Sequence, residues 1–187
     1  MKIKFITLLF TLAAIAAQSA FAEKADKDKP MNIEADSLKH DDQKQLTIFT
    51  GKVLMTKGTL VLRAARMEVK QDNQGNQVAT LSAEPGERVF FRQKREGVDE
   101  YTEGEADIAI YDKQADQVTL IQRAEARILR GTEVANQVTG DKIVFNNTTE
   151  VMTVDRPAPG AKATDPRDQR VRAVLTPRKT NPATTPV

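Results

Sequence analysis

Cysteine and tryptophan are absent from the 187 residues, and His40 is the only histidine. Without cysteine the chain forms no disulfides, so its stability must come from backbone pairing and apolar burial. His40 lies in a polar, turn-like stretch, and we interpret it as exposed. Cysteine nucleophiles, Ser-His-Asp triads and histidine-based zinc sites therefore lack their residues, and we expect neither an enzyme nor a cofactor or metal.

A strongly basic face is also missing. Lys and Arg number 28 and Asp and Glu number 26. Lys2 and Lys4 account for the difference, and the other charges of both signs are interspersed without a basic block. A nucleic-acid binder needs a basic face, so we expect no nucleic acid among the partners.

Long uncharged runs are rare, and the clearest one is Phe5–Ala17 near the N-terminus. It follows the two lysines and precedes the small-residue pattern Ala20-Phe21-Ala22. This order is typical of a secretory signal peptide, and the run is too short for the roughly 20 residues of a membrane-spanning helix. We expect a signal peptide over residues 1–22, cleavage between Ala22 and Glu23, and localisation in the periplasm.

The rest of the chain has the pattern of turn residues and short apolar runs that is typical of β-structure. Glycine, proline and asparagine separate short runs of Val, Ile, Leu, Thr and Phe, which favour strands, and helical periodicity is weak. We expect strands over residues 31–34, 46–56, 60–71, 77–84, 88–93, 105–111, 117–121, 125–129, 134–139, 142–145, 151–155 and 171–175. The predicted turns are 57–58, 72–76, 84–86 and 146–147.

These segments predict one all-β domain over residues 31–176. Residues 23–30 are a charged, flexible lead-in, the proline-containing segment 156–168 is a loop, and the proline-rich tail 177–187 is disordered.

An internal repeat supports stacked β-units. Residues 34–41 align with 105–112, a strand follows in each copy, and each copy then reaches a basic-Gly-Thr turn, at 57–59 and at 130–132. A two-stranded hairpin alone is marginal, so stacking would let each unit bury its apolar face against the next. Asp36 and Asp107 occupy equivalent repeat positions, and we interpret them as turn residues rather than as a catalytic carboxylate pair.

Several short pieces occur in a fixed order behind the signal peptide: residues 30–36 (Pro-Met-Asn-Ile-Glu-Ala-Asp), 49–53 (Phe-Thr-Gly-Lys-Val), 58–60, 90–94 (Phe-Phe-Arg-Gln-Lys), 103–106, 111–112, 140–143 and 170–177. In this order they resemble the LptA (OstA-like) family of periplasmic lipopolysaccharide-transport proteins, over about residues 30–177. The proline-containing stretch 156–167 departs from the family pattern and leaves the pairing of the last strand open.

The resemblance implies a twisted antiparallel β-jelly roll, shaped like a folded taco, made of stacked hairpins and open at both ends. It also implies an interior that binds the lipid A acyl chains of lipopolysaccharide. Members join head to tail and dock by edge-strand pairing with inner-membrane LptC and outer-membrane LptD, which forms a bridge across the periplasm. The family has no catalytic residues and no cofactor.

Six residues are candidate walls of a continuous apolar trough. By the resemblance, Ile33 falls in the first groove-lining strand, Phe90 in an aromatic strand, and Tyr111 at the aromatic position before Asp112. The apolar pattern adds Phe49, Val53 and Ile108. Each of the six could equally be an ordinary core residue.

The end strands are candidate pairing edges, because an unpaired strand can add a strand from another chain. The edge residues are Met31 and Ile33 at one end and Val171, Ala173 and Leu175 at the other. A non-catalytic periplasmic scaffold that binds proteins by strand addition is therefore the alternative function.

Overall fold

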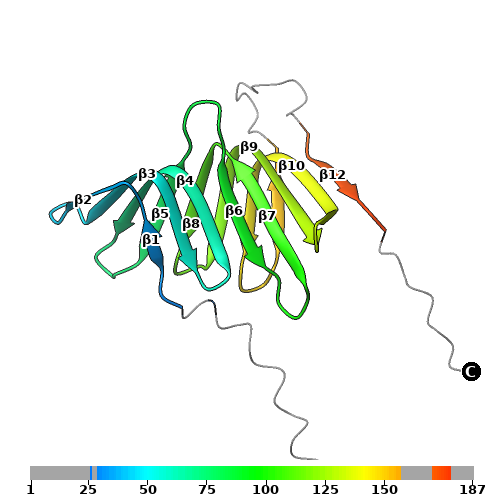
Figure 1. Ribbon diagram of the computed structural model, residues 1–187, viewed down its shortest axis with the longest axis horizontal. Helices are drawn as coiled ribbons and strands as arrows, with labels where there is room; N and C mark the ends of the chain where they lie inside the picture. Colours follow the sequence, from blue (N-terminus) through cyan, green and yellow to red (C-terminus); the bar gives the residue numbers. More distant parts are fainter. Residues whose placement is uncertain (1–25, 27–28, 157–169, 178–187) are drawn as a thin grey trace, which may run out of the picture.

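The computed structural model describes residues 26, 29–156 and 170–177, and this part of the chain is built almost entirely of antiparallel strands (Figure 1). The strands are β1 (Asn32–Glu34), β2 (Ser37–Asp41), β3 (Leu46–Lys57), β4 (Leu60–Gln71), β5 (Gln77–Ser82), β6 (Val89–Lys94), β7 (Glu100–Ala106), β8 (Ile108–Asp112), β9 (Gln117–Arg130), β10 (Glu133–Asn146), β11 (Met152–Asp155) and β12 (Arg172–Leu175). The predicted all-β class is confirmed. No helix in the described residues is long and apolar enough to cross a membrane.

The strands form two layers that share their longest members. Layer A holds β2, β5, β8 and β11, and layer B holds β1, β6, β7 and β12. The long strands β3, β4, β9 and β10 pass through both layers, because different halves of each pair with different neighbours. One continuous hydrogen-bonded sheet is thus folded into a jelly roll, as the resemblance predicted.

The fold line, here called the crease, is where the strands pass from one layer to the other. The strand pairing shifts register between Thr50 and Val53 and between Gly140 and Lys142. Gly51 has a φ of 83°, which glycine tolerates without steric cost. These bulges bend the long strands, as β-bulges do in barrels and folded sheets.

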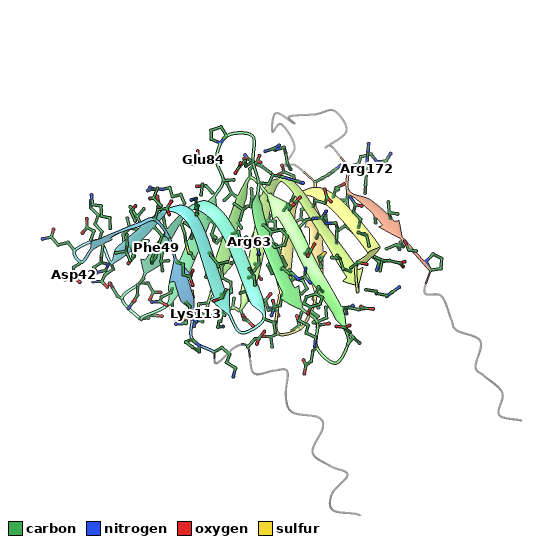
Figure 2. The ribbon with its side chains drawn as sticks, in the orientation of Figure 1. Asp42, Phe49, Arg63, Glu84, Lys113 and Arg172 are labelled. Carbon is green, nitrogen blue, oxygen red and sulfur yellow. The ribbon has the colours of Figure 1, made fainter. Side chains whose placement is uncertain are left out.

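The opposite margin, here called the seam, is where the hairpin turns of the two layers face each other. Layer B supplies the turns between β3 and β4, β6 and β7, and β9 and β10, and layer A supplies those between β4 and β5, β8 and β9, and β10 and β11. Figure 2 places Glu84, in the loop that crosses the crease, and Lys113, in a layer A turn, at opposite margins of the molecule.

The internal repeat is confirmed by equivalent crease contacts. The backbone N–H of Asp36 donates to the carbonyl of Gly51 at 2.9 Å, and that of Asp107 donates to the carbonyl of Gln122 at 3.0 Å. Lys52 and Arg123, which follow the two acceptors, both have positive φ, 45° and 48°. Each copy is therefore a layer B strand, a crossing of the crease, a layer A strand, a turn and a long strand that returns through both layers.

Bending explains where the predicted strand limits were wrong. Residues 117–121 and 125–129 belong to the one bent strand β9, and residues 134–139 and 142–145 belong to β10. The predicted strand 105–111 is divided at the crease between β7 and β8. β2 and most of β7 were not predicted, because their sequences, SLKHD and EYTEGEA, are largely polar.

Several predicted segments lie wholly or partly outside the described residues. The signal peptide, residues 157–168 of the predicted loop and residues 178–187 of the tail lie outside the described residues. In the lead-in, the Asp26 carboxylate accepts a hydrogen bond from the backbone N–H of Thr59 at 2.8 Å. This contact holds the described part of the lead-in against the turn between β3 and β4.

The two layers approach closely at Gly104 on β7. A β-carbon there would lie 2.5 Å from the Leu120 side chain of layer A and 3.3 Å from Phe91. Replacing Gly104 by Ala is therefore expected to lower the free energy of unfolding by about 1–3 kcal/mol, as overpacking does, measured by urea denaturation.

Shortening Leu120 in the same chain tests this reason. The double variant Gly104→Ala, Leu120→Val is expected to be more stable than the sum of the two single effects predicts, because the contact is removed. Val134→Ala, at an exposed position, is a control expected to stay within about 0.5 kcal/mol of the parent. Additive effects of the two substitutions would contradict a direct contact.

Candidate functional site

The space between the layers is lined by apolar side chains from both. Layer A contributes Met67, Val69, Ala79, Leu81, Ala109, Tyr111, Val118, Leu120, Ile143 and Phe145, and layer B contributes Val53, Met55, Leu60, Leu62, Val89, Phe91, Ala106, Ala124 and Ala126. The rings of Phe91 and Phe145 meet across the layers with centroids 5.7 Å apart. Apart from the Tyr111 hydroxyl, the side chains of this cluster are hydrocarbon and sulfur.

The centre of this interior is filled. Met55, Leu62, Met67 and Leu81 have no exposed surface, and the other members of the cluster are nearly as buried. The predicted continuous open trough is therefore wrong for this conformation. The apolar side chains of each layer are long enough to close on those of the other, as expected for sheets that pack face to face.

Four of the six predicted wall residues point into the interior. Val53 and Tyr111 are buried in its centre, at 1% exposure each. Ile33 and Phe49 are partly buried and pack against the same cluster. Their cross-strand partners, Met55 for Ile33 and Met67 for Phe49, are themselves core residues.

Phe90 and Ile108 lie on the outer faces, so the prediction that they line the interior is wrong. The neighbouring Val89 and Phe91 are buried in the interior, and successive side chains of a strand point to opposite faces. The Phe90 ring lies instead beneath the guanidinium of Arg63, at 5.2 Å. Ile108 is half-buried and pairs with Ile121. Its side chain points to the face opposite that of the buried Ala109.

Hydrophobicity alone does not distinguish Phe90 from Phe91, because both are large apolar residues on one strand. The burial alternation of β6 decides it, since Val89, Phe91 and Gln93 are buried and Phe90, Arg92 and Lys94 are half-buried. In the sequence the same alternation is visible only as the charges of Arg92 and Lys94, two and four residues after Phe90. That signal could have identified Phe91 as the interior residue.

Polar groups gather where the seam closes the interior. Lys57, at the layer B end of β3, donates a hydrogen bond to the Tyr111 hydroxyl of layer A at 3.0 Å. The Tyr111 hydroxyl donates in turn to Oδ1 of Asp116 at 3.2 Å, and Lys57 Nζ lies 3.8 Å from the same oxygen. Burial raises the pKa of Tyr111 and the Asp116 carboxylate raises it further, so the hydroxyl keeps its proton.

A second group crosses the seam beside the first. Arg95, in the layer B turn between β6 and β7, lies 3.0 Å from Glu150 Oε2, in the layer A turn between β10 and β11. Arg95 also pairs with the buried Glu100, as does Arg130. The hydrogen bond from Arg130 holds the pKa of the Glu100 carboxyl below its usual range, while burial opposes this shift.

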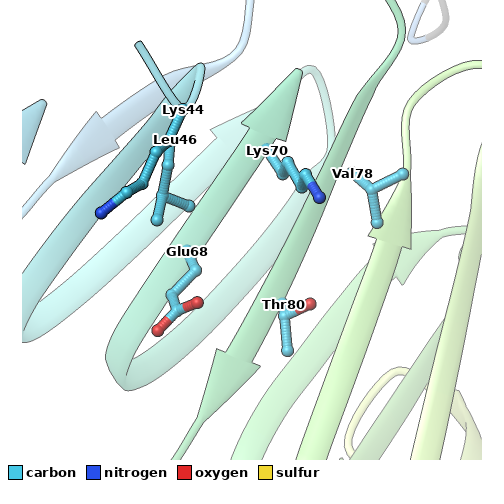
Figure 3. Close-up of a pocket in the computed structure, with 6 residues that line it drawn as sticks. All are labelled: Lys44, Leu46, Glu68, Lys70, Val78 and Thr80. Atoms are coloured by element: carbon cyan, nitrogen blue, oxygen red, sulfur yellow. The ribbon is translucent and has the colours of Figure 1, made fainter. Parts of the chain in front are cut away.

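Layer A also carries a shallow pocket on its outer face, lined by Lys44, Leu46, Glu68, Lys70, Val78 and Thr80 (Figure 3). Leu46, Lys70 and Val78 are direct neighbours across β3, β4 and β5. The pocket is separated from the interior by the sheet itself. Within the described residues, no group of three or more His, Cys, Asp or Glu side chains could hold a metal ion.

The two ends of the jelly roll present strand edges. β1 and β2 lie at one end, and β11 and β12 lie at the other (Figure 1). Of the predicted edge residues, Met31 and Ile33 are partly buried against the core, whereas Val171, Ala173 and Leu175 are exposed, Leu175 at 71%. β12 pairs with β10, which answers the pairing of the last strand that the sequence left open.

Comparison with known proteins places this fold in a family. A family profile described as LptA/(LptD N-terminal domain) LPS transport protein matches residues 32–151. The chain belongs to this family. The resemblance seen in the sequence is thereby confirmed, and the match covers strands of both layers from β1 through the turn between β10 and β11.

Relatives in this LptA family match over most of their length. The lipopolysaccharide export system protein LptH of Pseudomonas aeruginosa is 27% identical over 175 residues, which cover 93% of this chain and 95% of LptH. The lipopolysaccharide export system protein LptA of Escherichia coli K12 is 30% identical over 151 residues, 76% of this chain and 77% of that protein.

A solved structure has the same fold. The crystal structure of LptH, described as the LptA homologous periplasmic component of the conserved lipopolysaccharide transport device from Pseudomonas aeruginosa, superposes with a TM-score of 0.69. The match has 26% sequence identity and covers 82% of this chain and 99% of LptH.

Replacing Phe91 and Phe90 separately tests which face each occupies. Phe91→Ala is expected to lower the free energy of unfolding by about 3–5 kcal/mol, because it removes a buried ring from the interior. Phe90→Ala is expected to lower it by about 1 kcal/mol, the scale of its contact with Arg63. Urea denaturation of both variants measures the difference, and equal losses would contradict the assignment.

Proposed function

We propose that this chain binds lipopolysaccharide through its lipid A acyl chains, held between layers A and B, and carries it across the periplasm from the inner to the outer membrane. The observation that carries the proposal is the apolar lining that both layers of a family jelly roll supply to one shared interior. Its relatives are named as lipopolysaccharide export proteins. The chain acts without catalysis, as a binding protein.

The physical reason is the cost of exposing acyl chains to water. Each buried methylene is worth about 0.8 kcal/mol, so a lipid with several chains faces a barrier of tens of kcal/mol in crossing an aqueous compartment. An interior of aliphatic and Phe side chains removes most of this barrier, while the sugars and phosphates stay hydrated outside the seam. In the present conformation the layers are closed on each other, so acyl chains enter only as the layers separate.

The proposed partners follow from the ends of the jelly roll. β12 is exposed along its whole length, and a free strand edge can pair with an edge of another chain. We propose that copies join head to tail, the edge at β11 and β12 of one meeting the edge at β1 and β2 of the next, and that LptC and LptD dock at the two terminal edges. The bridge so formed keeps the lipid shielded throughout.

The filled centre of the interior favours the alternative, a scaffold that binds proteins by strand addition and holds no lipid. The two functions differ in what touches the inward side chains. Lipid transport requires contact between lipid and the interior side chains, whereas a scaffold has no such contact. Both functions use the strand edges to bind proteins.

Photo-crosslinking separates the two functions. A benzophenone side chain at Ile33 or Phe49, which are inward and partly buried, is expected to form adducts with lipopolysaccharide. The same group at Phe90 or Ile108 is the matched control and is expected to form few, because those residues lie on the outer faces. Adducts are measured by gel mobility and immunoblotting, and equal yields at inward and outward positions would count against lipid binding between the layers.

Proline at the free edge tests head-to-tail pairing. The N–H of Thr176 donates to the carbonyl of Ala135 on β10, so by the alternation of an antiparallel ladder the N–H of Ala173 faces the free edge. Ala173→Pro removes that donor without breaking the β10 ladder, and is expected to weaken self-association at least about tenfold in sedimentation velocity. Ala173→Thr keeps the donor and is the control. Unchanged association of the proline variant would exclude this edge.

A further inference from the structure

Ion pairs cross the seam between layer B and layer A, and the proposed function assigns them no role. Layer B supplies the cations Lys57, Arg95 and Arg130 and the buried acid Glu100. Layer A supplies the acids Asp116 and Glu150. In each of these two ion pairs the cation comes from layer B and the carboxylate from layer A, and their attraction holds the two layers together.

The central contact of this seam is buried. Lys57 is 2% exposed and Asp116 is 6% exposed, and the Tyr111 hydroxyl lies within hydrogen-bond distance of both. Separating a buried ion pair without replacement is strongly unfavourable. A closed seam is thus stable, and opening it requires something that replaces the lost partner of Lys57.

At the inner contact the acid keeps other partners when the layers part, whereas Lys57 loses its partners across the seam. Asp116 also accepts hydrogen bonds from the Asn147 amide and the Thr148 hydroxyl, at 3.1 Å each, and both residues belong to layer A. The partners of Lys57 across the seam, Tyr111 and Asp116, both belong to layer A and would leave with it. Arg95 would keep Glu100 but lose Glu150.

The second contact is less buried and stands beside the first. Arg95 and Glu150 are 29% and 24% exposed, and Oε1 of Glu150 accepts the backbone N–H of Glu96 at 2.6 Å. Glu150 lies in a tight turn with a φ of 55°, and its carboxylate is held by Arg95 and the Glu96 backbone N–H. This contact is the outer closure of the seam, accessible to solvent and to a charged ligand.

We propose that the seam is a lateral gate for the lipid, and that on opening Lys57 and Arg95 exchange the carboxylates of layer A for a phosphate group of the bound amphiphile. The proposal rests on the proposed function. An acyl chain moving in between the layers brings its phosphorylated headgroup to the seam, where the two cations have just lost their layer A carboxylates. Arginine and lysine both bind phosphate through charge-assisted hydrogen bonds, so the ligand supplies the replacement that opening needs.

The crease gives the layers a line about which to part. Strands cross it at bulges, where the ladder is already interrupted, and the backbone hydrogen bonds of each layer stay intact on either side. Opening the seam therefore requires no unpairing of strands. It separates the two apolar walls, whose contacts the acyl chains then replace.

Breaking the outer contact from either side tests the proposal. Glu150→Gln removes the layer A carboxylate from Arg95, so association of fluorescent diphosphoryl lipid A with the mature chain is expected to be about fivefold faster and its binding no weaker. Arg95→Gln breaks the same contact but removes the phosphate ligand, so binding of diphosphoryl lipid A is expected to weaken about tenfold. Loss of affinity in Arg95→Gln but not in Glu150→Gln is the signature, because a merely structural ion pair would give the same change from both sides.

Monophosphoryl lipid A identifies the group recognised. The parent chain and Glu150→Gln are expected to prefer diphosphoryl over monophosphoryl lipid A, and Arg95→Gln is expected to lose most of this preference. Glu68→Gln and Arg66→Gln are the matched controls, since they break a pair of 2.6 Å outside the seam, and neither is expected to change binding. Circular dichroism confirms that each variant is folded.

Two results would overturn the gate. One is an equal change in affinity for Glu150→Gln and Arg95→Gln, and the other is retention of the phosphate preference by Arg95→Gln. Where either variant does not fold, Asp116→Asn and Lys57→Gln make the same comparison at the inner contact. Failure of the unmodified chain to bind both lipids would instead overturn the proposed function itself, and the gate with it.

Discussion

Backbone hydrogen bonding along strands that belong to two layers is the constraint on which the molecule depends. β3, β4, β9 and β10 each pair in both layers, so neither layer exists without the other. With no cysteine in the chain and no metal cluster in its described part, this shared ladder and the apolar burial it organises supply the stability. Disrupting one long strand would disturb both walls of the interior at once.

The interior illustrates a conflict between stability and binding. A protein without a ligand gains from closing its apolar walls on each other, and the fully buried Met55, Leu62 and Met67 show that it does so here. A lipid-binding protein must give up those contacts when the ligand enters. The exchange is nearly even, because acyl chains and aliphatic side chains bury similar hydrocarbon. The polar seam then determines when the exchange occurs, since it is the part that a hydrocarbon chain cannot replace.

Much of this could be predicted from the sequence. Alternating apolar runs, turn residues and the repeat gave the all-β class, most strand positions and the order of the hairpins, because these are local properties. β7 was largely missed, since its inward residues include Glu100, Thr102 and Gly104 and carry no apolar signal. Glu100 is tolerated inside only because Arg95 and Arg130 neutralise it, and those residues lie in other segments.

The sequence predicted an apolar interior between the layers, but not which residues line it. The choice between Phe90 and Phe91 depends on which side of the sheet faces the other layer, and a run with apolar residues on both faces leaves it undecided. The seam could not be predicted from the sequence, for a different reason. Lys57 and Asp116 are 59 positions apart in the sequence, and only the folding of the sheet about the crease brings them together.

The unlike ends of the jelly roll have a consequence for any row of such molecules. β1 is a three-residue strand partly buried against the core, whereas β12 is a four-residue strand exposed along its length. An interface between unlike surfaces does not close on itself as a two-fold dimer does. In a row built this way every subunit has the same orientation. The row is therefore polar, and its two ends present different strand edges.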